Sequence, residues 1–154
     1  MFLSNSDFEE VIKKTPMIAI DLCITNNEKI LLGKRNNPPA KNSYFVPGGR
    51  IRKSEPIKKA LNRLIYDETG RTLKKDNQIK LIGIFEHFYD DNFQGNLDFD
   101  SHYIVIAYSL PLIMLTEISS DFLNKQHSEY VWVEYKKSSD LNIHKNTTAY
   151  FGFL

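Results

Sequence analysis

Every second position of residues 17–25, MIAIDLCIT, carries a large aliphatic side chain. This period of two predicts a β-strand, because successive side chains of a strand point to opposite faces. Residues 29–35, KILLGKR, predict a second strand, and the polar NNE between the two segments predicts a hairpin. Further apolar segments predict strands over 79–89, 102–110 and 129–135.

A different period governs the segment that begins after residue 53. Apolar residues recur at i, i+3, i+4, i+7 and i+8, as on the buried face of an amphipathic helix: Ile57, Ala60, Leu61, Leu64 and Ile65. Ser54 is predicted to cap the helix, with Pro56 in its first turn, and Gly70 to end it. Continued from Leu64, the same stripe reaches Glu68. The pattern therefore predicts that this carboxylate faces the interior or a cleft, not solvent.

Two shorter helices are predicted at the ends of the chain. Residues 6–14, SDFEEVIKK, form a capped helical pattern that Pro16 ends, and residues 146–154, NTTAYFGFL, predict a short final helix. The loop NNPPAKNS contains two prolines, which exclude regular structure there. Strands on both sides of a central helix, without βαβ regularity, predict an α+β layered fold, and 154 residues predict a single domain over 1–154.

Charge and composition exclude several classes of partner. Twenty basic residues balance nineteen acidic ones, so no global field holds nucleic acid or an anionic membrane, and any phosphate binding must be local. No basic leader or long apolar run suggests a signal peptide or a membrane span. The lone cysteine, Cys23, excludes an internal disulfide and favours a reducing compartment, so a cytoplasmic protein is expected.

The segment from Gly49 to Gly70 resembles the Nudix box: glycine, five residues, glutamate, seven residues, then Arg-Glu-apolar-x-Glu-Glu-x-Gly. Six positions match in register over this stretch: Gly49, Glu55, Arg63, Ile65, Glu68 and Gly70. Three positions depart from the pattern, because Leu64 and Asp67 replace glutamates and Arg71 takes an apolar position. Glu55 and Arg63 are expected to brace the loop and helix. The box implies a Mg²⁺ site built from hard oxygen ligands, and with one strong acidic ligand left, a single metal is expected.

Longer segments are similar to the GDP-mannose mannosyl hydrolases, a Nudix branch that breaks the sugar–oxygen bond: ILLGKRNNPPA, YFVPGGR, EHFYDDNF, HYIV and KQH. The resemblance extends from MFLSNSDF through NTTAYF. It implies the Nudix fold, a mixed β-sheet sandwiched between helices with the box as loop–helix–loop. It also implies a homodimer that hydrolyses GDP-mannose and GDP-glucose to GDP and free hexose, with one Mg²⁺ per subunit and Mn²⁺ as a substitute.

The resemblance assigns a role to each matching residue. Glu68, the Gly49 carbonyl and Gln126 would hold the metal, and His127 would be the general base. Arg35 and Arg50 would bind the diphosphate and stabilise the departing charge, and Tyr103 would donate a hydrogen bond to it. Asp21 and His87 match polar positions of the sugar and nucleotide site.

The chemistry of the leaving group agrees with these assignments. Glycosidases commonly need an acid to protonate a poor leaving group, whereas GDP leaves as a stable anion once a metal and arginines neutralise its charge. Only a base for the attacking water is then required, and histidine suits neutral pH.

Two other functions stay open from the sequence. A conventional Nudix pyrophosphohydrolase would release GMP and a sugar 1-phosphate, with Asp67 as a second metal ligand. A non-catalytic Nudix module would bind a nucleotide sugar as a sensor. Turnover with Mg²⁺ and the identity of the products distinguish the three.

Overall fold

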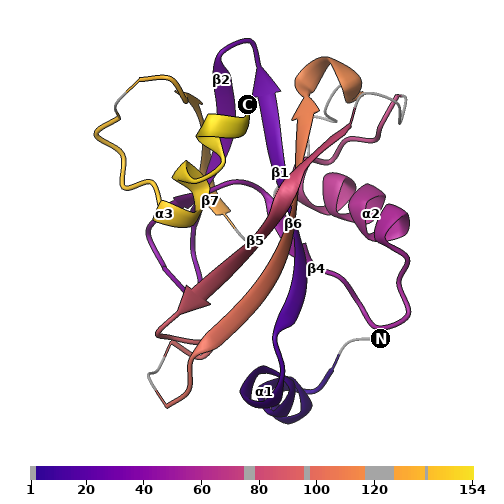
Figure 1. The fold of residues 1–154 in the computed structure, drawn as a ribbon, viewed down its shortest axis with the longest axis vertical. Coiled ribbons are helices and arrows are strands. Elements are labelled where there is room, and N and C mark those ends of the chain that lie inside the picture. Colours follow the sequence, from indigo (N-terminus) through magenta and orange to yellow (C-terminus); the bar gives the residue numbers. More distant parts are fainter. Residues whose placement is uncertain (1–2, 75–78, 96–97, 117–126, 138) are drawn as a thin grey trace.

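The alternating strand at residues 17–25 becomes the centre of a mixed sheet (Figure 1). The structure is a computed structural model that describes residues 3–74, 79–95, 98–116, 127–137 and 139–154. Strand β1 (Met17–Asn26) pairs in parallel with β6 (Ser101–Pro111) along its length. Its end forms the predicted antiparallel hairpin with β2 (Lys29–Arg35), in which Thr25 faces Ile30.

Four further strands complete the sheet. The long strand β5 (Lys80–Tyr89) pairs antiparallel with β6 and ends the order β3-β2-β1-β6-β5. Strands β3 (Tyr44–Phe45) and β7 (His127–Glu134) pair with β2, and β4 (Gly48–Arg50) pairs with β1. The sequence pattern did not predict β3 or β4, because two or three residues are too short to show a period and glycine has a low strand propensity.

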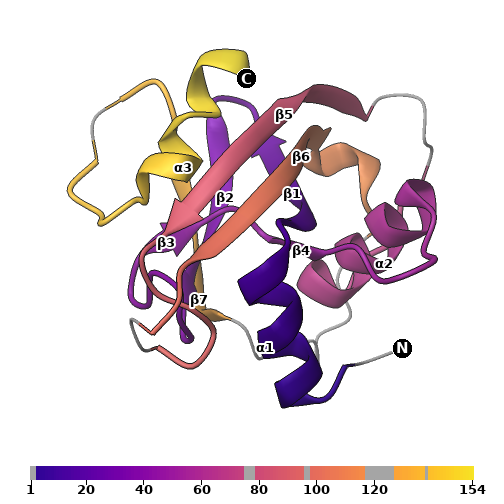
Figure 2. The same ribbon diagram turned by 60° about the horizontal axis from the view of Figure 1, so that its bottom comes forward.

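Helices cover both faces of the sheet (Figures 1 and 2). On one face, alternate side chains of β1 pack against helix α2 (Ile57–Thr69) and the turn η1 (Leu112–Met114). On the other face, the core includes Cys23 of β1 and Tyr150, which lies between helix α3 (Lys145–Thr148) and the turn η2 (Phe151–Phe153). Helix α1 (Asn5–Lys14) precedes β1, and its N-cap is Ser4. The α+β class and the layered arrangement predicted from the sequence are confirmed.

The start of α2 differs from the prediction, whereas its end agrees. Pro56, not Ser54, is the N-cap residue. Ser54 has φ 63° in a tight turn that places the Glu55 N–H 3.0 Å from the Arg52 carbonyl oxygen, so it lies before the helix and cannot cap it. Gly70 ends the helix in the left-handed conformation that glycine tolerates best, and its N–H donates to the Tyr66 carbonyl at 2.8 Å.

Glu55 and Arg63 brace the loop against the helix, as the sequence predicted. The Arg63 guanidinium donates to both Glu55 oxygens, at 2.6 and 2.8 Å, and also to the Arg50 carbonyl at 3.0 Å. The Arg52 N–H donates to the same carboxylate at 2.9 Å. This arrangement lowers the pKa of Glu55 to about 2, with the hydrogen bonds from Arg63 as the main cause. The brace connects strand β4, the loop and helix α2 in one charged cluster.

Replacing Glu55 with Gln should therefore lower the free energy of unfolding at pH 7 by about 2 kcal/mol, the size expected for hydrogen bonds to a charged group. Because the folded pKa lies below the ordinary 4.5, this stabilisation is present above pH 4.5 and is lost as the pH falls towards 2. Urea denaturation at pH 7 and at low pH measures both effects. Glu28→Gln, which removes an exposed ion pair with Lys136, is the control and should cost less than about 0.5 kcal/mol. Equal losses in the two variants would contradict the bracing role.

Candidate active site

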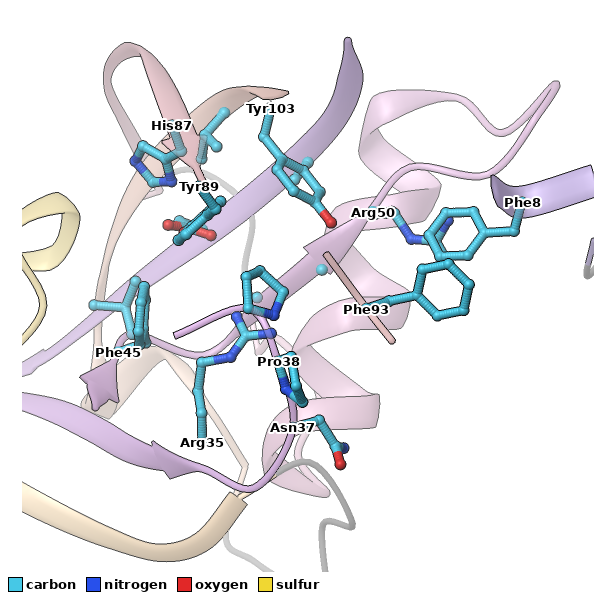
Figure 3. A pocket seen from close by; sticks show the side chains of 17 residues that line it. Phe8, Arg35, Asn37, Pro38, Phe45, Arg50, His87, Tyr89, Phe93 and Tyr103 are labelled. Carbon is cyan, nitrogen blue, oxygen red and sulfur yellow. The ribbon is translucent and has the colours of Figure 1, made fainter. Parts of the chain in front are cut away.

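A cavity of about 280 Å³ is lined by residues of six strands, β1 to β6, and of helix α1 (Figure 3). Six of the residues singled out in the sequence line it: Asp21, Arg35, Gly49, Arg50, His87 and Tyr103. They come from β1, β2, β4, β5 and β6, and sheet register brings them together. Ala19 of β1 pairs with Arg50 of β4, and His87 of β5 pairs with Tyr103 of β6. Segments far apart in the chain therefore contribute to one site.

Two arginines and a tyrosine form the cationic part of this cavity. In Figure 3, Arg35 reaches in from one side, and Tyr103 and Arg50 lie across from it. The Arg35 guanidinium lies 5.2 Å from the centre of the Phe45 ring, and that of Arg50 lies 3.7 Å from the Phe8 ring. Burial raises the pKa of Tyr103, and the charges of Arg50 and Arg35 oppose that rise. The Tyr103 phenol is thus a neutral hydrogen-bond donor between two cations, a suitable set for an anionic diphosphate.

Asp21 belongs to a partly buried network of hydrogen bonds. The Tyr150 hydroxyl donates to Asp21 Oδ2 at 2.6 Å and lies 3.1 Å from His87 Nε2. Burial raises the pKa of Asp21 to about 6, against the hydrogen bond from Tyr150 and the charge of Arg35. Burial also lowers the pKa of His87 to about 4, with His144 adding to the effect. At neutral pH, this end of the cavity therefore presents an ionised carboxylate and a neutral imidazole.

Glu68 faces inward, as its helical position predicted, and only 2% of it is exposed. It is not among the residues that line the larger cavity. It lines a second hollow of about 240 Å³, together with Tyr130 and Trp132 of β7. The Tyr130 hydroxyl donates to the Glu68 carbonyl oxygen at 3.0 Å. The charge of Glu68 contributes to the raised pKa of Asp21, so the two carboxylates interact electrostatically.

Two of the three substituted box positions, Leu64 and Asp67, differ in where their side chains lie. Leu64 is buried in the core beneath the sheet, against Gly49, where an added Cβ would lie 2.7 Å from Leu64 Cδ2. Asp67 lies on the outer side of α2, 43% exposed, and Arg63 donates to it at 3.2 Å. Among the carboxylates of α2, Glu68 alone is buried.

In strand β4, the backbone carbonyls of Gly48 and Gly49 point in opposite directions. Hydrogen bonds on either side of the β1–β4 pair join Leu22 N–H to Pro47 O (2.8 Å) and Ile51 N–H to Ile18 O (2.9 Å). Hydrogen-bonded and non-hydrogen-bonded pairs alternate along an antiparallel ladder. The Gly49–Ile20 pair, midway between those two bonds, is therefore a hydrogen-bonded pair, and the Gly49 carbonyl faces β1. Gly48, opposite Asp21, turns its carbonyl away from β1. The Gly49 carbonyl, which the sequence analysis assigns to the metal, thus lies on the side of β4 that faces β1, and its role as a ligand stays a prediction.

Two predicted residues lie partly or wholly outside the described chain. Gln126 is outside it. His127 begins β7, where its backbone pairs with that of Arg35, but its side chain is not described. The backbone of the predicted base, His127, thus lies next to strand β2, which carries Arg35. Within the described ranges, no group of three or more His, Cys, Asp or Glu side chains converges as a metal site.

Sequence reasoning missed the aromatic residues of the cavity and the buried tyrosine behind it. Phe8 of α1 and Phe93 line the cavity with ring centres 4.8 Å apart, and Tyr89 lines it from β5. Phe93 stands in an otherwise polar loop, DDNFQGNLDFD, which is a signal that could have been used. For Phe8 and Tyr150 the local pattern offers none, because each is an ordinary apolar position of a short helical segment.

Comparison with known proteins agrees with the fold and the box. The family model of the NUDIX domain matches residues 15–151, and the chain belongs to the Nudix family. The low-salt glycan biosynthesis protein Agl8 of Haloferax volcanii is 33% identical over 110 residues, which make up 71% of this chain and 68% of that protein. Nudix hydrolases typically use a divalent metal such as Mg²⁺ and act on small-molecule substrates.

Two further proteins show how far the similarity extends. The ADP-ribose pyrophosphatase of Methanocaldococcus jannaschii is 33% identical over 98 residues, covering 64% of this chain, but the chain spans only about half (52%) of its length. The crystal structure of the MutT NUDIX hydrolase from Burkholderia pseudomallei superposes with a TM-score of 0.72 at 20% identity, covering 92% of this chain and 99% of that one. In the part of the chain that is described, no helix has the length and apolarity to span a membrane.

The raised pKa of Asp21 has a consequence for stability. Between pH 3.8 and about 6 the folded state holds more protons at Asp21 than the unfolded state, so this group lowers stability as the pH rises through that window. Asp21→Asn removes the effect. Relative to wild type, the variant should gain stability between pH 4 and pH 7, by up to about 3 kcal/mol. Chemical denaturation at the two pH values measures the change, and a difference independent of pH would contradict the raised pKa.

Proposed function

We propose that this Nudix hydrolase cleaves a GDP-hexose, GDP-mannose or GDP-glucose, at the sugar–oxygen bond and releases GDP and free hexose. One observation carries the proposal. Of the three carboxylate positions of the usual box helix, Leu64 is apolar, Asp67 points outward to Arg63, and only Glu68 provides a buried carboxylate. Attack at phosphorus in an ordinary Nudix enzyme uses several carboxylates, and this helix keeps one.

The cationic part of the cavity suits a leaving diphosphate. Burial raises the pKa of Tyr103, and the nearby guanidinium charges of Arg50 and Arg35 oppose that rise, so all three side chains can donate to the same anion. Guanidinium groups bind phosphate oxygens with two parallel hydrogen bonds, which fixes orientation as well as charge. As the C1–oxygen bond breaks, negative charge grows on the diphosphate, and these three donors would stabilise it without an acid.

The ends of the substrate would lie in chemically different surroundings. Phe8 and Phe93 offer aromatic faces on which a nucleobase can stack. At the other end of the cavity, the Asp21 carboxylate and the neutral His87 imidazole can form hydrogen bonds with sugar hydroxyls. The name of the Agl8 relative places that protein in glycan biosynthesis, a metabolism that uses nucleotide sugars, which supports this class of substrate.

The donor set fits a single hard cation. Glu68, the Gly49 carbonyl and Gln126 would hold Mg²⁺ as oxygen ligands. When bound, the metal would supply positive charge that neutralises the leaving diphosphate. His127 would accept the proton of the water that attacks C1. The His127 backbone pairs with that of Arg35, the residue that would bind the diphosphate, and this pairing supports the assignment.

The relative named as an ADP-ribose pyrophosphatase supports a second candidate, a conventional pyrophosphohydrolase that gives GMP and a sugar 1-phosphate. That reaction would require Asp67 as a further ligand. In the structure, Asp67 accepts a hydrogen bond from Arg63 on the outer side of the helix, which favours cleavage at the sugar.

Neighbouring carboxylates on α2 provide a matched pair of variants. Glu68→Gln should weaken Mg²⁺ binding by at least about 10–100-fold, the range known for residues that merely support a metal ligand, and should lower turnover at limiting Mg²⁺. Asp67→Asn should leave both properties near wild type, because its side chain faces solvent. Calorimetry of Mg²⁺ binding is the measurement, with turnover as a second readout. A strong loss in Asp67→Asn would favour the pyrophosphohydrolase.

The bond that breaks can be identified with labelled water. Attack of water at C1 opposite the departing GDP would invert the anomeric centre in one displacement, with His127 as the base and Asp21 as a ligand of the sugar hydroxyls, not a nucleophile. Hydrolysis of α-linked GDP-mannose in ¹⁸O water should therefore put the label in mannose and none in GDP, and β-mannose should appear first. Mass spectrometry and proton NMR give these readings. Label in a phosphate, or GMP among the products, would establish the second candidate.

A further inference from the structure

A tyrosine of the C-terminal segment connects two polar residues of the cavity, although it does not line the cavity itself. Tyr150 is fully buried, and its ring packs edge-on against Phe85, with centres 4.9 Å apart and planes at 82°. Its hydroxyl lies 2.6 Å from Asp21 Oδ2 and 3.1 Å from His87 Nε2. The three residues stand on the N-terminal strand β1, on β5 and between the last two helical turns.

The number of protons on the Asp21, Tyr150 and His87 side chains decides the direction of each hydrogen bond between them. At pH 7.5, above the pKa of about 6 for Asp21 and about 4 for His87, the carboxylate is ionised and the imidazole is neutral. An ionised carboxylate only accepts, so Tyr150 gives it the single hydroxyl proton. The hydroxyl oxygen can then only accept from His87, and Nε2 must carry the imidazole proton. Nδ1 is left as the acceptor nitrogen of the ring.

We propose that Tyr150 is a positioning residue that holds His87 in the Nε2–H tautomer and Asp21 in its rotamer. The cavity then presents a fixed pair of acceptors, the Asp21 carboxylate and the His87 Nδ1, to the hydroxyl donors of the hexose. The tautomer part stands on the two hydrogen-bond distances and on the protonation states of Asp21 and His87, whereas the effect on the hexose rests on the proposed function.

Tyr150→Phe is the natural test, because it removes the hydroxyl and keeps the ring that packs against Phe85. Tyr135→Phe is the matched control: it is the same chemical change in a residue that packs against the neighbouring Phe151, 6.3 Å between ring centres, and that does not line the cavity. Thermal unfolding of both variants confirms that they are folded before any comparison.

Long-range ¹H–¹⁵N spectra of histidine-labelled protein without ligand at pH 7.5 show which nitrogen bears the proton, with His87 assigned from a His87→Gln sample. We expect Nε2–H in wild type and in Tyr135→Phe, and a substantial Nδ1–H population in Tyr150→Phe. Nδ1–H in wild type would overturn the proposal. So would an unchanged Nε2–H signal in Tyr150→Phe. The wild-type spectrum alone decides the hydrogen-bond direction if the variant fails to fold.

Kinetics separate the two ends of the substrate. Tyr150→Phe should lower kcat/KM for GDP-mannose by roughly tenfold, as expected for the loss of about one oriented hydrogen bond, while the inhibition constant of GDP, which lacks the hexose, stays at the wild-type value. An equal loss for GDP would show a general structural role and contradict the proposal. If wild type does not turn over GDP-hexoses at all, the proposed function fails, and the tautomer measurement still stands.

Discussion

Helix α2 sits directly on the backbone of strand β4, and the rest of the site depends on this contact. The absence of a side chain at Gly49 leaves the space that Leu64 fills, since an added Cβ would lie 2.7 Å from Leu64 Cδ2. Gly48 is similarly constrained, because a Cβ there would lie 2.5 Å from the Ile20 carbonyl oxygen. With Leu64 in this position, Glu68 one turn later is necessarily on the inner side of the helix.

The same contact explains why the helix keeps one buried carboxylate. Leu64 contributes apolar packing where the usual box has a glutamate, and a charged side chain at this depth would need partners that the core does not supply. Asp67, one position before Glu68, is turned outward and is held there by Arg63, which also binds Glu55. Packing and ion pairing together thus leave Glu68 as the inward acid of the helix.

Electrostatics divide the cavity into two parts. The guanidinium groups of Arg35 and Arg50 surround Tyr103, so this part attracts anions and keeps donors available to them. Burial disfavours the charged form of both Asp21 and His87, so it raises the pKa of Asp21 and lowers the pKa of His87. Tyr150 then satisfies a carboxylate whose burial would otherwise be costly, and connects it to the imidazole. The arrangement suits a ligand with an anionic centre and a polar, uncharged end.

Local patterns in the sequence were sufficient to predict the hairpin of β1 and β2, helix α2 with its glycine end, and the inward direction of Glu68. Each of these features depends on a period of two or 3.6 residues and on contacts between residues close together in the chain. The tertiary structure alone decided the short strands β3 and β4, the outward direction of Asp67, the aromatic pair of Phe8 and Phe93, and the chain from Asp21 through Tyr150 to His87. The last of these joins residues 129 and 63 positions apart, and no local period records a contact across such a separation. Only the register of the sheet and the return of the C-terminal segment to β1 bring those groups within hydrogen-bonding distance.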